Sequence, residues 1–559
     1  MSSTEIETIT TVPDAVELHP AEETKSNDEP HPHPDAFDTI EDSQPPEIAY
    51  PKGFKFSMIC AAIALALVLT GIDMQIVATA VPSITDEFHT IVDIGWYSAA
   101  FKLAFCAFQF MFGKMYTIFS IKWVYVASLL IFEAGSVLCA TAPTSAVFVL
   151  GRAVCGLGCA GIVSGCFTMI TLSVPLRQRP VFSGAAAVVE EIASVCGPLL
   201  GGVITDNISW RWCFYINLPL GALTLGILIF FFQSPEVPYA EANNPANLSL
   251  KEKLARLDLL GTAIFVPGIT SMLLGLQFGG SKFGWGDPRI VICFVLFGIL
   301  LTTFGWWQWR RGDEATLPPR IMSNRNIMFG MWFSLCNAST YSIVGYYMPI
   351  YFQAVRGFSA ARSGILLLPS IIGIMVALFL AGSATSAIGY YAPLMLTTSF
   401  LTPIATGLLT TLKVSMPMAK LIIYQALLGF GAGIGWQGPQ VAAQSIFSEK
   451  DISQGIACIL FAQSFGPAIS IPIAQAIFSG RLVSDVGKNM DGLAIDANSL
   501  QSLGLTDLRK MVGAKELEGV LLGYDTAVTQ TFYLPLGLAC ATLVGSAAME
   551  WRSVKKKRN

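Results

Sequence analysis

Long apolar runs separated by short polar segments dominate the chain and define the elements that it predicts. A helix needs about 20 mostly apolar residues to cross a bilayer. Fourteen runs approach this length: six in the first part of the chain, two in the middle and six in the last part. They lie near residues 56–80, 95–114, 122–142, 147–172, 181–205, 213–232, 258–278, 289–309, 327–353, 364–388, 391–411, 420–440, 456–480 and 531–550. The pattern predicts an all-α membrane protein with 14 transmembrane helices.

The order of these runs divides the chain into predicted regions. Residues 1–54 are acidic and Pro-rich with almost no apolar clustering, which favours a disordered cytosolic tail. The regions that follow are two six-helix bundles, a linker with two extra spans and a short basic tail. They are predicted at 55–232 (first bundle), 233–326 (linker), 327–550 (second bundle, with an outer loop at 481–530) and 551–559 (basic cytosolic tail).

The composition agrees with a chain that lies mostly in lipid. Hydrophobic residues make up 53% of its 559 residues and charged residues only 13%, with a mean hydropathy of +0.59. Soluble domains carry about 25% charged residues. We therefore expect a multi-pass protein of the plasma membrane, with the vacuolar or a vesicle membrane as alternatives.

The positions of Lys and Arg predict the orientation. Cytosolic loops of membrane proteins carry an excess of these residues. With the N-terminus inside, most of the basic loops fall on the cytosolic side, and the first two outer loops contain no Lys or Arg. The long loop 481–530 would lie outside although it holds five of them. An even number of spans places both termini in the cytosol.

Cysteine and histidine usage argues against several kinds of site. The twelve cysteines lie nearly all in apolar segments, and three of the four histidines lie in the N-terminal tail. This distribution favours neither a disulfide framework nor a histidine-based metal or catalytic site. The chain also has no Gly-x-x-x-x-Gly-Lys-Ser/Thr phosphate loop. We expect no enzyme, no cofactor, no metal and no nucleic-acid partner.

A glycine-rich segment in the fifth run is the most informative motif. It reads Gly197-Pro198-Leu199-Leu200-Gly201-Gly202. Proline removes a backbone donor and bends a helix, and small residues let membrane helices pack backbone to backbone. A pliable, closely packed helix suits a protein that alternates between two shapes, which indicates transport.

These motifs resemble the fourteen-span drug:proton antiporter branch of the major facilitator superfamily, and most closely its fungal toxin and multidrug exporters. The resemblance covers about residues 55–550. The antiporter motif of the family is matched by small residues and a proline in the fifth span, with alanine in place of the middle glycine. The matching positions are Gly184, Ala193, Gly197, Pro198, Gly201 and Gly202. The resemblance implies two six-helix bundles of the major facilitator type plus two extra spans, and transport by a rocking motion.

Other stretches carry the same resemblance. The first span contains Asp73 in a segment that ends in Ala80-Val81-Pro82, and the fourth span carries Arg152 followed by Gly156. The basic loop after the second span keeps Gly113 but lacks the usual acidic residue of the family. This departure speaks against a complete charge latch in that loop.

Ionisable residues within the runs are the candidates for proton coupling or substrate binding, because charges in a membrane usually face a cavity or a partner. Asp73 fits a proton or cation site, or a structural partner of a nearby helix. For Arg152 the resemblance implies a role in proton coupling, and the alternative is helix packing. Glu190 and Glu191 could bind protons or a cationic substrate, or could reach toward the inner boundary. Lys102 and Glu133 are weaker candidates of the same kind.

Amides in the later spans, Gln437, Gln444 and Gln463, are candidate donors into a cavity. Taken together, the residues and the resemblance predict a monomeric, proton-coupled exporter of a hydrophobic or amphipathic small molecule, such as a fungal secondary metabolite, toxin or drug. An importer of a nutrient, amino acid or iron chelate, and a membrane receptor without transport, are the alternatives.

Overall fold

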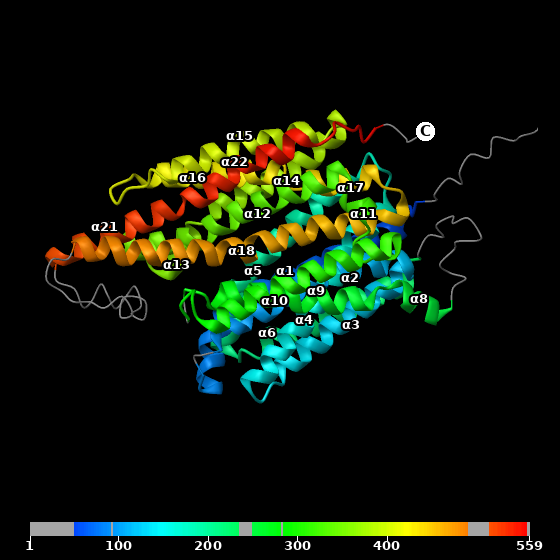
Figure 1. Ribbon diagram of the computed structural model, residues 1–559, viewed down its shortest axis with the longest axis horizontal. Coiled ribbons are helices and arrows are strands. Elements are labelled where there is room, and N and C mark those ends of the chain that lie inside the picture. Colours follow the sequence, from blue (N-terminus) through cyan, green and yellow to red (C-terminus); the bar gives the residue numbers. More distant parts are fainter. Residues whose placement is uncertain (1–49, 91–92, 234–248, 281–282, 490–513, 556–559) are drawn as a thin grey trace, which may run out of the picture. The chain divides into compact units, whose positions relative to one another are not determined.

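The computed structural model describes residues 50–90, 93–233, 249–280, 283–489 and 514–555. Most of the predicted N-terminal tail, the centre of the predicted outer loop and the last four residues lie outside these ranges. The described part of the chain is helical and holds no β-strand, only two isolated bridges. Figure 1 shows its long helices running side by side.

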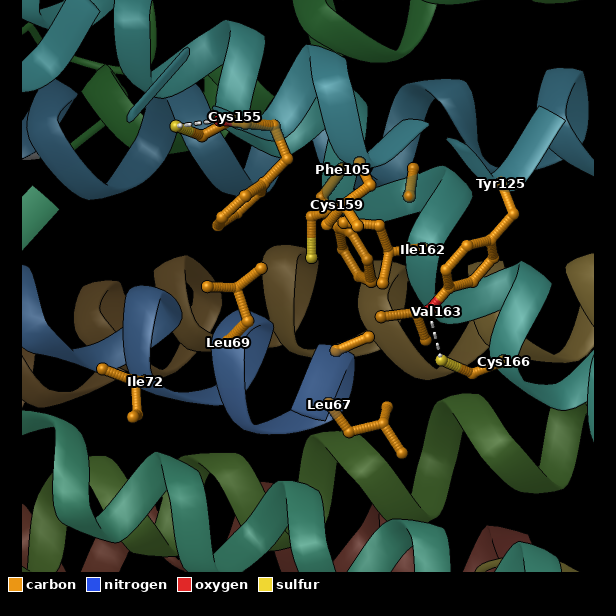
Figure 2. Close-up of a cluster of buried hydrophobic side chains, with 14 of the residues drawn as sticks. Leu67, Leu69, Ile72, Phe105, Tyr125, Cys155, Cys159, Ile162, Val163 and Cys166 are labelled. Atoms are coloured by element: carbon orange, nitrogen blue, oxygen red, sulfur yellow. Dashed lines mark hydrogen bonds between the residues drawn. The ribbon is translucent and has the colours of Figure 1, made fainter. Parts of the chain in front are cut away.

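The first bundle contains α1 to α7. Its helices are α1 (Gly53–Phe88), α2 (Ile94–Ile118), α3 (Ile121–Ala140), α4 (Ser145–Ser173), α5 (Arg179–Asn207), α6 (Trp212–Tyr215) and α7 (Asn217–Phe231). The closest neighbours are α1 with α5, α3 with α4 and α2 with α4. One large apolar cluster fills the space between them, and Figure 2 shows part of it.

The part of this cluster drawn in Figure 2 contains labelled side chains of α1, α2, α3 and α4, among them Leu67, Phe105 and Cys159. The hydroxyl of Tyr125 on α3 lies 3.2 Å from the Cys166 sulfur on α4 (Figure 2). These cysteines are fully buried and pack as small apolar side chains.

Two long helices and several short segments join the bundles. They are α8 (Leu250–Arg256), α9 (Leu259–Phe278), α10 (Pro288–Arg311), the 3₁₀ turn η4 (Gly312–Glu314) and α11 (Pro319–Met322). Helix α9 contacts α10, and on its other side α2 and α18. Helix α10 is mostly exposed, as expected of a helix that faces lipid.

The second bundle contains α12 to α22. Its elements are α12 (Arg325–Ile350), the π-helical turn η5 (Tyr351–Val355), α13 (Ala360–Ile365), α14 (Leu368–Ile388), α15 (Ala392–Leu409), α16 (Met418–Ile434), α17 (Gly438–Ile446), α18 (Glu449–Asn489), α21 (Ala514–Thr531) and α22 (Tyr533–Ala548). It meets the first bundle mainly through α18 against α2 and α14 against α5.

Twelve helices in the described ranges are long and apolar enough to cross a membrane, which supports a multi-pass membrane protein. Two further helices of comparable length, α2 and α12, are too polar to meet that criterion. Helix α2 carries Lys102 and Lys114, and α12 carries Asn337 among other polar residues. The predicted number of fourteen spans therefore stays a prediction.

The span predicted at 420–440 lies within one candidate membrane span, Met418–Ile446. Its helix is interrupted between α16 and α17, and Pro439 in the first turn of α17 lacks the backbone N–H that would continue the ladder. The outer loop at 481–530 stays a prediction, and the helices beside it are long: α18 continues to Asn489 and α21 already begins at Ala514. These helices extend because they pack on each other: the rings of Phe478 and Tyr524 lie 6.3 Å apart.

The predicted end of the span 364–388, just before Gly389, is confirmed. Helix α14 ends at Ile388, and Gly389 adopts a φ of 93°. Only glycine adopts this backbone conformation without strain, so it ends the helix and lets α15 begin at Ala392.

Candidate functional site

A buried ion pair joins α1 to α4 inside the first bundle. Arg152 Nη1 lies 2.7 Å from Asp73 Oδ2, and the two side chains are 1% and 0% exposed. The guanidinium also donates from Nε to the Tyr97 carbonyl over 3.1 Å and lies over the Phe101 ring, 4.5 Å from its centroid. The structure thus brings together Asp73 and Arg152, which are 79 residues apart in the chain.

The second oxygen of Asp73 has its own partner, which the sequence did not reveal. Asn217, at the start of α7, donates from Nδ2 to Asp73 Oδ1 over 3.2 Å and to Ser136 Oγ over 3.1 Å. Asn217 is 1% exposed. A polar residue that opens an apolar run was the only signal for it, and its partner on α1 could not be read from the sequence.

Three other acids within the helices, Glu133, Glu190 and Glu191, are not paired with bases among the described residues. Glu133 on α3 is 8% exposed, and neither of its carboxylate oxygens has a hydrogen-bond partner among the described residues. It lies against Gly221 of α7. Glu190 and Glu191 on α5 are half-buried, and no hydrogen bond joins either carboxylate to a described residue. The carbonyl of Glu190 faces Gly71 of α1.

The glycine motif brings α5 against α1. A Cβ added to Gly197 would lie 2.9 Å from the Ile72 carbonyl oxygen, and one added to Gly201 would lie 2.5 Å from Thr79 Oγ1. One turn earlier, the Ala193 methyl would lie 2.8 Å from a Cβ on Gly71. The alanine at 193 is therefore matched by a glycine on the facing helix.

The remaining motif residues face elsewhere. Gly184 approaches α14, where a Cβ would lie 2.8 Å from the Leu378 carbonyl oxygen. Gly202 has open space around it. Pro198 lies inside α5, which remains one helix from Arg179 to Asn207. The motif thus contacts both the first bundle and the second.

Two of the predicted glutamines, Gln437 and Gln463, lie at the break between α16 and α17, whereas Gln444 lies near the end of α17 with its side-chain amide unpartnered among the described residues. Gln463 of α18 donates to the Trp436 carbonyl over 3.3 Å and accepts from Gln440 over 3.2 Å. Gln437 caps α17 and is 5% exposed, with its Oε1 unpartnered among the described residues. The side chains of Gln463 and Gln440 therefore hydrogen-bond to each other, and Gln463 to the backbone, where the helix is interrupted.

The two bundles are held together at one end. Thr168 Oγ1 lies 3.4 Å from Ser453 Oγ, Arg179 donates to the Gln444 carbonyl over 3.3 Å, and Ser386 donates to the Arg177 carbonyl over 2.7 Å. These hydrogen bonds join the first bundle to the second. They lie at the end that the Lys and Arg pattern assigns to the cytosol.

A buried carboxylate organises the linker at this same end. Asp258 is 0% exposed and has a φ of 53°, a conformation that aspartate tolerates better than most residues. It accepts hydrogen bonds from Gly261, Trp307, Gln308 and Thr316, each 2.8–3.0 Å long. Burial raises the pKa of this carboxyl, but these hydrogen bonds outweigh burial and hold it below its ordinary value.

The segment after α10 then bridges the bundles. Arg320 forms a two-pronged ion pair with Asp451 at the start of α18, at 2.8 and 3.0 Å, and it also lies 3.3 Å from Asp313. Lys114 of α2 donates to the Asp313 carbonyl over 3.3 Å. The hydrogen bonds to Asp451 raise the pKa of Arg320. We call these four residues the linker clasp.

No group of three or more His, Cys, Asp or Glu side chains in the described ranges is placed to hold a metal ion. The chemistry of the site therefore consists of a buried acid–base pair, unpaired acids and closely packed glycines.

Comparison with known proteins places this arrangement in a family. The model of the Major Facilitator Superfamily matches residues 63–470. The MFS-type efflux pump MFS1 of Trichophyton rubrum is 42% identical, with 90% of this chain and 93% of the relative covered. The efflux pump roqT of Penicillium rubens is also 42% identical, with 89% and 91% covered.

A solved structure has the same fold at low sequence identity. The proton:xylose symporter XylE superposes with a TM-score of 0.54 and 15% identity, over 86% of this chain and 94% of that one. At this identity the likeness concerns the fold alone. The family model and the curated relatives, together with the paired helical bundles, show that the chain belongs to the Major Facilitator Superfamily.

Proposed function

We propose that the protein is a proton-coupled efflux transporter that exports a hydrophobic or amphipathic small molecule, such as a fungal secondary metabolite, toxin or drug. The observation that carries the proposal is the Asp73–Arg152 pair, an acid and a base that are both buried and in contact. Its support for export comes from relatives that are named efflux pumps and are about 42% identical over most of the chain.

The pair offers a place for the transported proton. A proton on Asp73 removes its negative charge and with it the attraction of the Arg152 guanidinium 2.7 Å away. A buried cation without its partner is strongly unfavourable, so the helices around it would have to rearrange. Protonation is thereby coupled to a change in the packing of α1 and α4.

The glycine contacts carry such a change toward the second bundle. Helix α1 packs on α5 through Gly71, Gly197 and Gly201, and α5 packs on α14 through Gly184. Close backbone contacts of this kind transmit a helix displacement with little slack. We propose that α5 links the proton site to the interface between the bundles, and that the two bundles rock about it.

We further propose that α2 and α12 cross the membrane as well, which gives the fourteen-span architecture of the drug:proton antiporter branch. Both are long enough, with 25 and 26 residues. Two of their polar residues have protein partners: Lys114 donates to the Asp313 backbone carbonyl, and Asn337 donates to the Ala432 carbonyl over 3.0 Å. Polar residues that are satisfied inside a bundle are tolerated in spans.

Fourteen spans place both termini in the cytosol, and the hydrogen bonds between the bundles then close the cytosolic end. We propose that this is the outward-facing conformation of a monomer in the plasma membrane. Glu190, Glu191, Gln437 and Gln463 are proposed to line the path of the substrate between the bundles.

The test is transport into inside-out vesicles whose interior is acidified, with a fluorescent amphipathic dye such as rhodamine 6G as the probe. The full-length protein is expected to accumulate the dye only while the proton gradient persists. The variant Asp73→Asn is expected to lose gradient-driven accumulation.

The matched control is Asp86→Asn, which changes an exposed acid on the same helix. It is expected to transport like the unmodified protein. Accumulation that is independent of the gradient, or that survives in Asp73→Asn, would contradict the proposal.

A further inference from the structure

A pocket opens between α2, α9 and α18. Its cavity volume is about 110 Å³. The residues that line it are Gly95, Trp96, Ala99, Lys102, Leu103, Leu273, Leu274, Gln277, Phe278 and Ala468. One wall is thus supplied by α9, the first of the two helices that lie between the bundles in the chain.

The walls of the pocket are apolar and aromatic. The α2 residues recur every three or four positions and form one helical face. The rings of Trp96 and Phe278 lie 5.8 Å apart. Leu103, Leu273 and Ala468 connect the pocket to the apolar cluster beneath it, in which the rings of Phe110 and Phe461 lie 4.4 Å apart. These surfaces suit a flat aromatic molecule.

Lys102 is the charged side chain among the lining residues. It is exposed within the pocket, and no hydrogen bond or ion pair joins its ammonium to any residue that the structure describes. The buried acid Asp73 already has Arg152 as its partner. A lone ammonium on a membrane helix is unfavourable unless an anion or water reaches it.

Lys102 lies too deep to reach the membrane surface easily. It follows Ile94, the first residue of α2, by eight positions, or about 12 Å along the helix. A lysine side chain extends roughly 6 Å, which corresponds to its five single bonds of about 1.5 Å each in a staggered chain. Even when the side chain extends toward the membrane surface, its ammonium stays well inside the span. The pocket is the space in which an anion or water could reach it.

We propose that this pocket binds the anionic group of an amphipathic aromatic molecule, with the Lys102 ammonium on its carboxylate or phenolate and its rings against Trp96 and Phe278. The inference deepens the proposed function, on which it rests, by naming the class of substrate. The unpaired acids Glu190 and Glu191 lie on α5, which packs on α1 and α14 rather than on the helices of this pocket. An anion in the pocket therefore meets a cation and aromatic edges.

The assignment is tested with two probes that differ only in charge, 1-pyrenebutyric acid and its methyl ester. Binding to the purified full-length protein in detergent is measured by energy transfer from tryptophan to pyrene, since Trp96 lines the pocket. Lys102→Gln is expected to weaken binding of the acid about tenfold or more, and to leave binding of the ester unchanged, because a charge-assisted hydrogen bond is lost.

Two further variants separate charge from packing. Lys102→Arg keeps the cation and is expected to retain affinity for the acid. Lys122→Gln removes a cation from the first turn of α3, where Lys122 donates to the Ile229 carbonyl. It is expected to change the affinity for neither the acid nor the ester. Equal loss for acid and ester, or equal loss in the Gln and Arg variants, overturns the proposal, as does acid binding that ignores Lys102.

Because binding is measured without a gradient, its outcome is separate from that of the transport test. Gradient-driven efflux of rhodamine 6G together with acid binding that is independent of Lys102 would refute the pocket and leave the exporter intact. Binding of the acid that depends on Lys102, without gradient-driven transport of either rhodamine 6G or 1-pyrenebutyric acid, would support the pocket and refute the exporter.

Discussion

The adjacent glycines Gly201 and Gly202 offer a direct test of how α5 packs on α1. A methyl group at Gly201 would lie 2.5 Å from Thr79 Oγ1 and 2.8 Å from the Ile76 carbonyl oxygen, whereas one at Gly202 would meet nothing within 4 Å. Both variants, Gly201→Ala and Gly202→Ala, gain the same helix propensity, about 1 kcal/mol relative to glycine. Only Gly201→Ala must push the helices apart, and overpacking typically costs about 1–3 kcal/mol.

The difference between the two variants therefore isolates the contact with α1. Gly202→Ala is expected to be neutral or more stable by up to about 1 kcal/mol. Gly201→Ala is expected to be less stable than Gly202→Ala by about 1–3 kcal/mol. The assay is unfolding of the purified proteins in mixed micelles at increasing denaturing detergent, followed by tryptophan fluorescence. Equal stability of the two variants would show that α1 and α5 are not in close contact.

Three further predictions concern the linker and the site. Asp258→Asn replaces a carboxylate whose pKa is held below its ordinary value by hydrogen bonds. This variant is expected to lower the free energy of unfolding by about 1–3 kcal/mol at neutral pH. The difference from the unmodified protein is expected to shrink as the pH falls below about 4, because a carboxyl with a depressed pKa stabilises the fold only while it is ionised. Unfolding curves between pH 3 and 7 measure this difference. Arg320→Ala removes the half-exposed pair with Asp451 and is expected to cost less than about 1 kcal/mol of stability. It is nevertheless expected to raise maleimide labelling, from the cytosolic side, of a cysteine introduced by Ser453→Cys. Unchanged labelling would argue against the linker clasp. Asn217→Ala leaves one oxygen of Asp73 without a donor, so the pH dependence of dye accumulation is expected to shift. The control Ser136→Ala keeps the Asn217–Asp73 hydrogen bond and is expected to shift the pH dependence less.

Much of the fold could be predicted because crossing a membrane is a local requirement. Each apolar run must satisfy its backbone hydrogen bonds within one helix, so its length and composition alone reveal it. The helix end at Gly389 was predictable for the same local reason. The close approach at Gly435 was not, since it is set by side chains from distant helices: a Cβ there would lie 2.6 Å from Thr398 Oγ1.

The site was only partly predictable. Asp73 and Arg152 stood out as charges in apolar runs, and their contact was beyond the reach of the sequence because it joins residues on different helices. Lys102 and Glu133 carried the same signal but have no ionic partner in the described structure. The loop after the second span lacked an acidic residue for a latch. In the linker clasp, Lys114 donates to the Asp313 backbone carbonyl instead, and the carboxylate of Asp451 pairs with Arg320 of the linker.

The sequence by itself thus determined that the chain is a multi-pass helical protein and which residues place charge or glycine in the membrane. Partition of side chains between water and lipid depends only on short stretches, so these properties are written in the order of the residues. The tertiary structure alone decided which charges are paired, which glycine faces which helix and where Lys102 opens onto a pocket. These features depend on how each helix is rotated against its neighbours, and that rotation is set by packing among residues far apart in the chain.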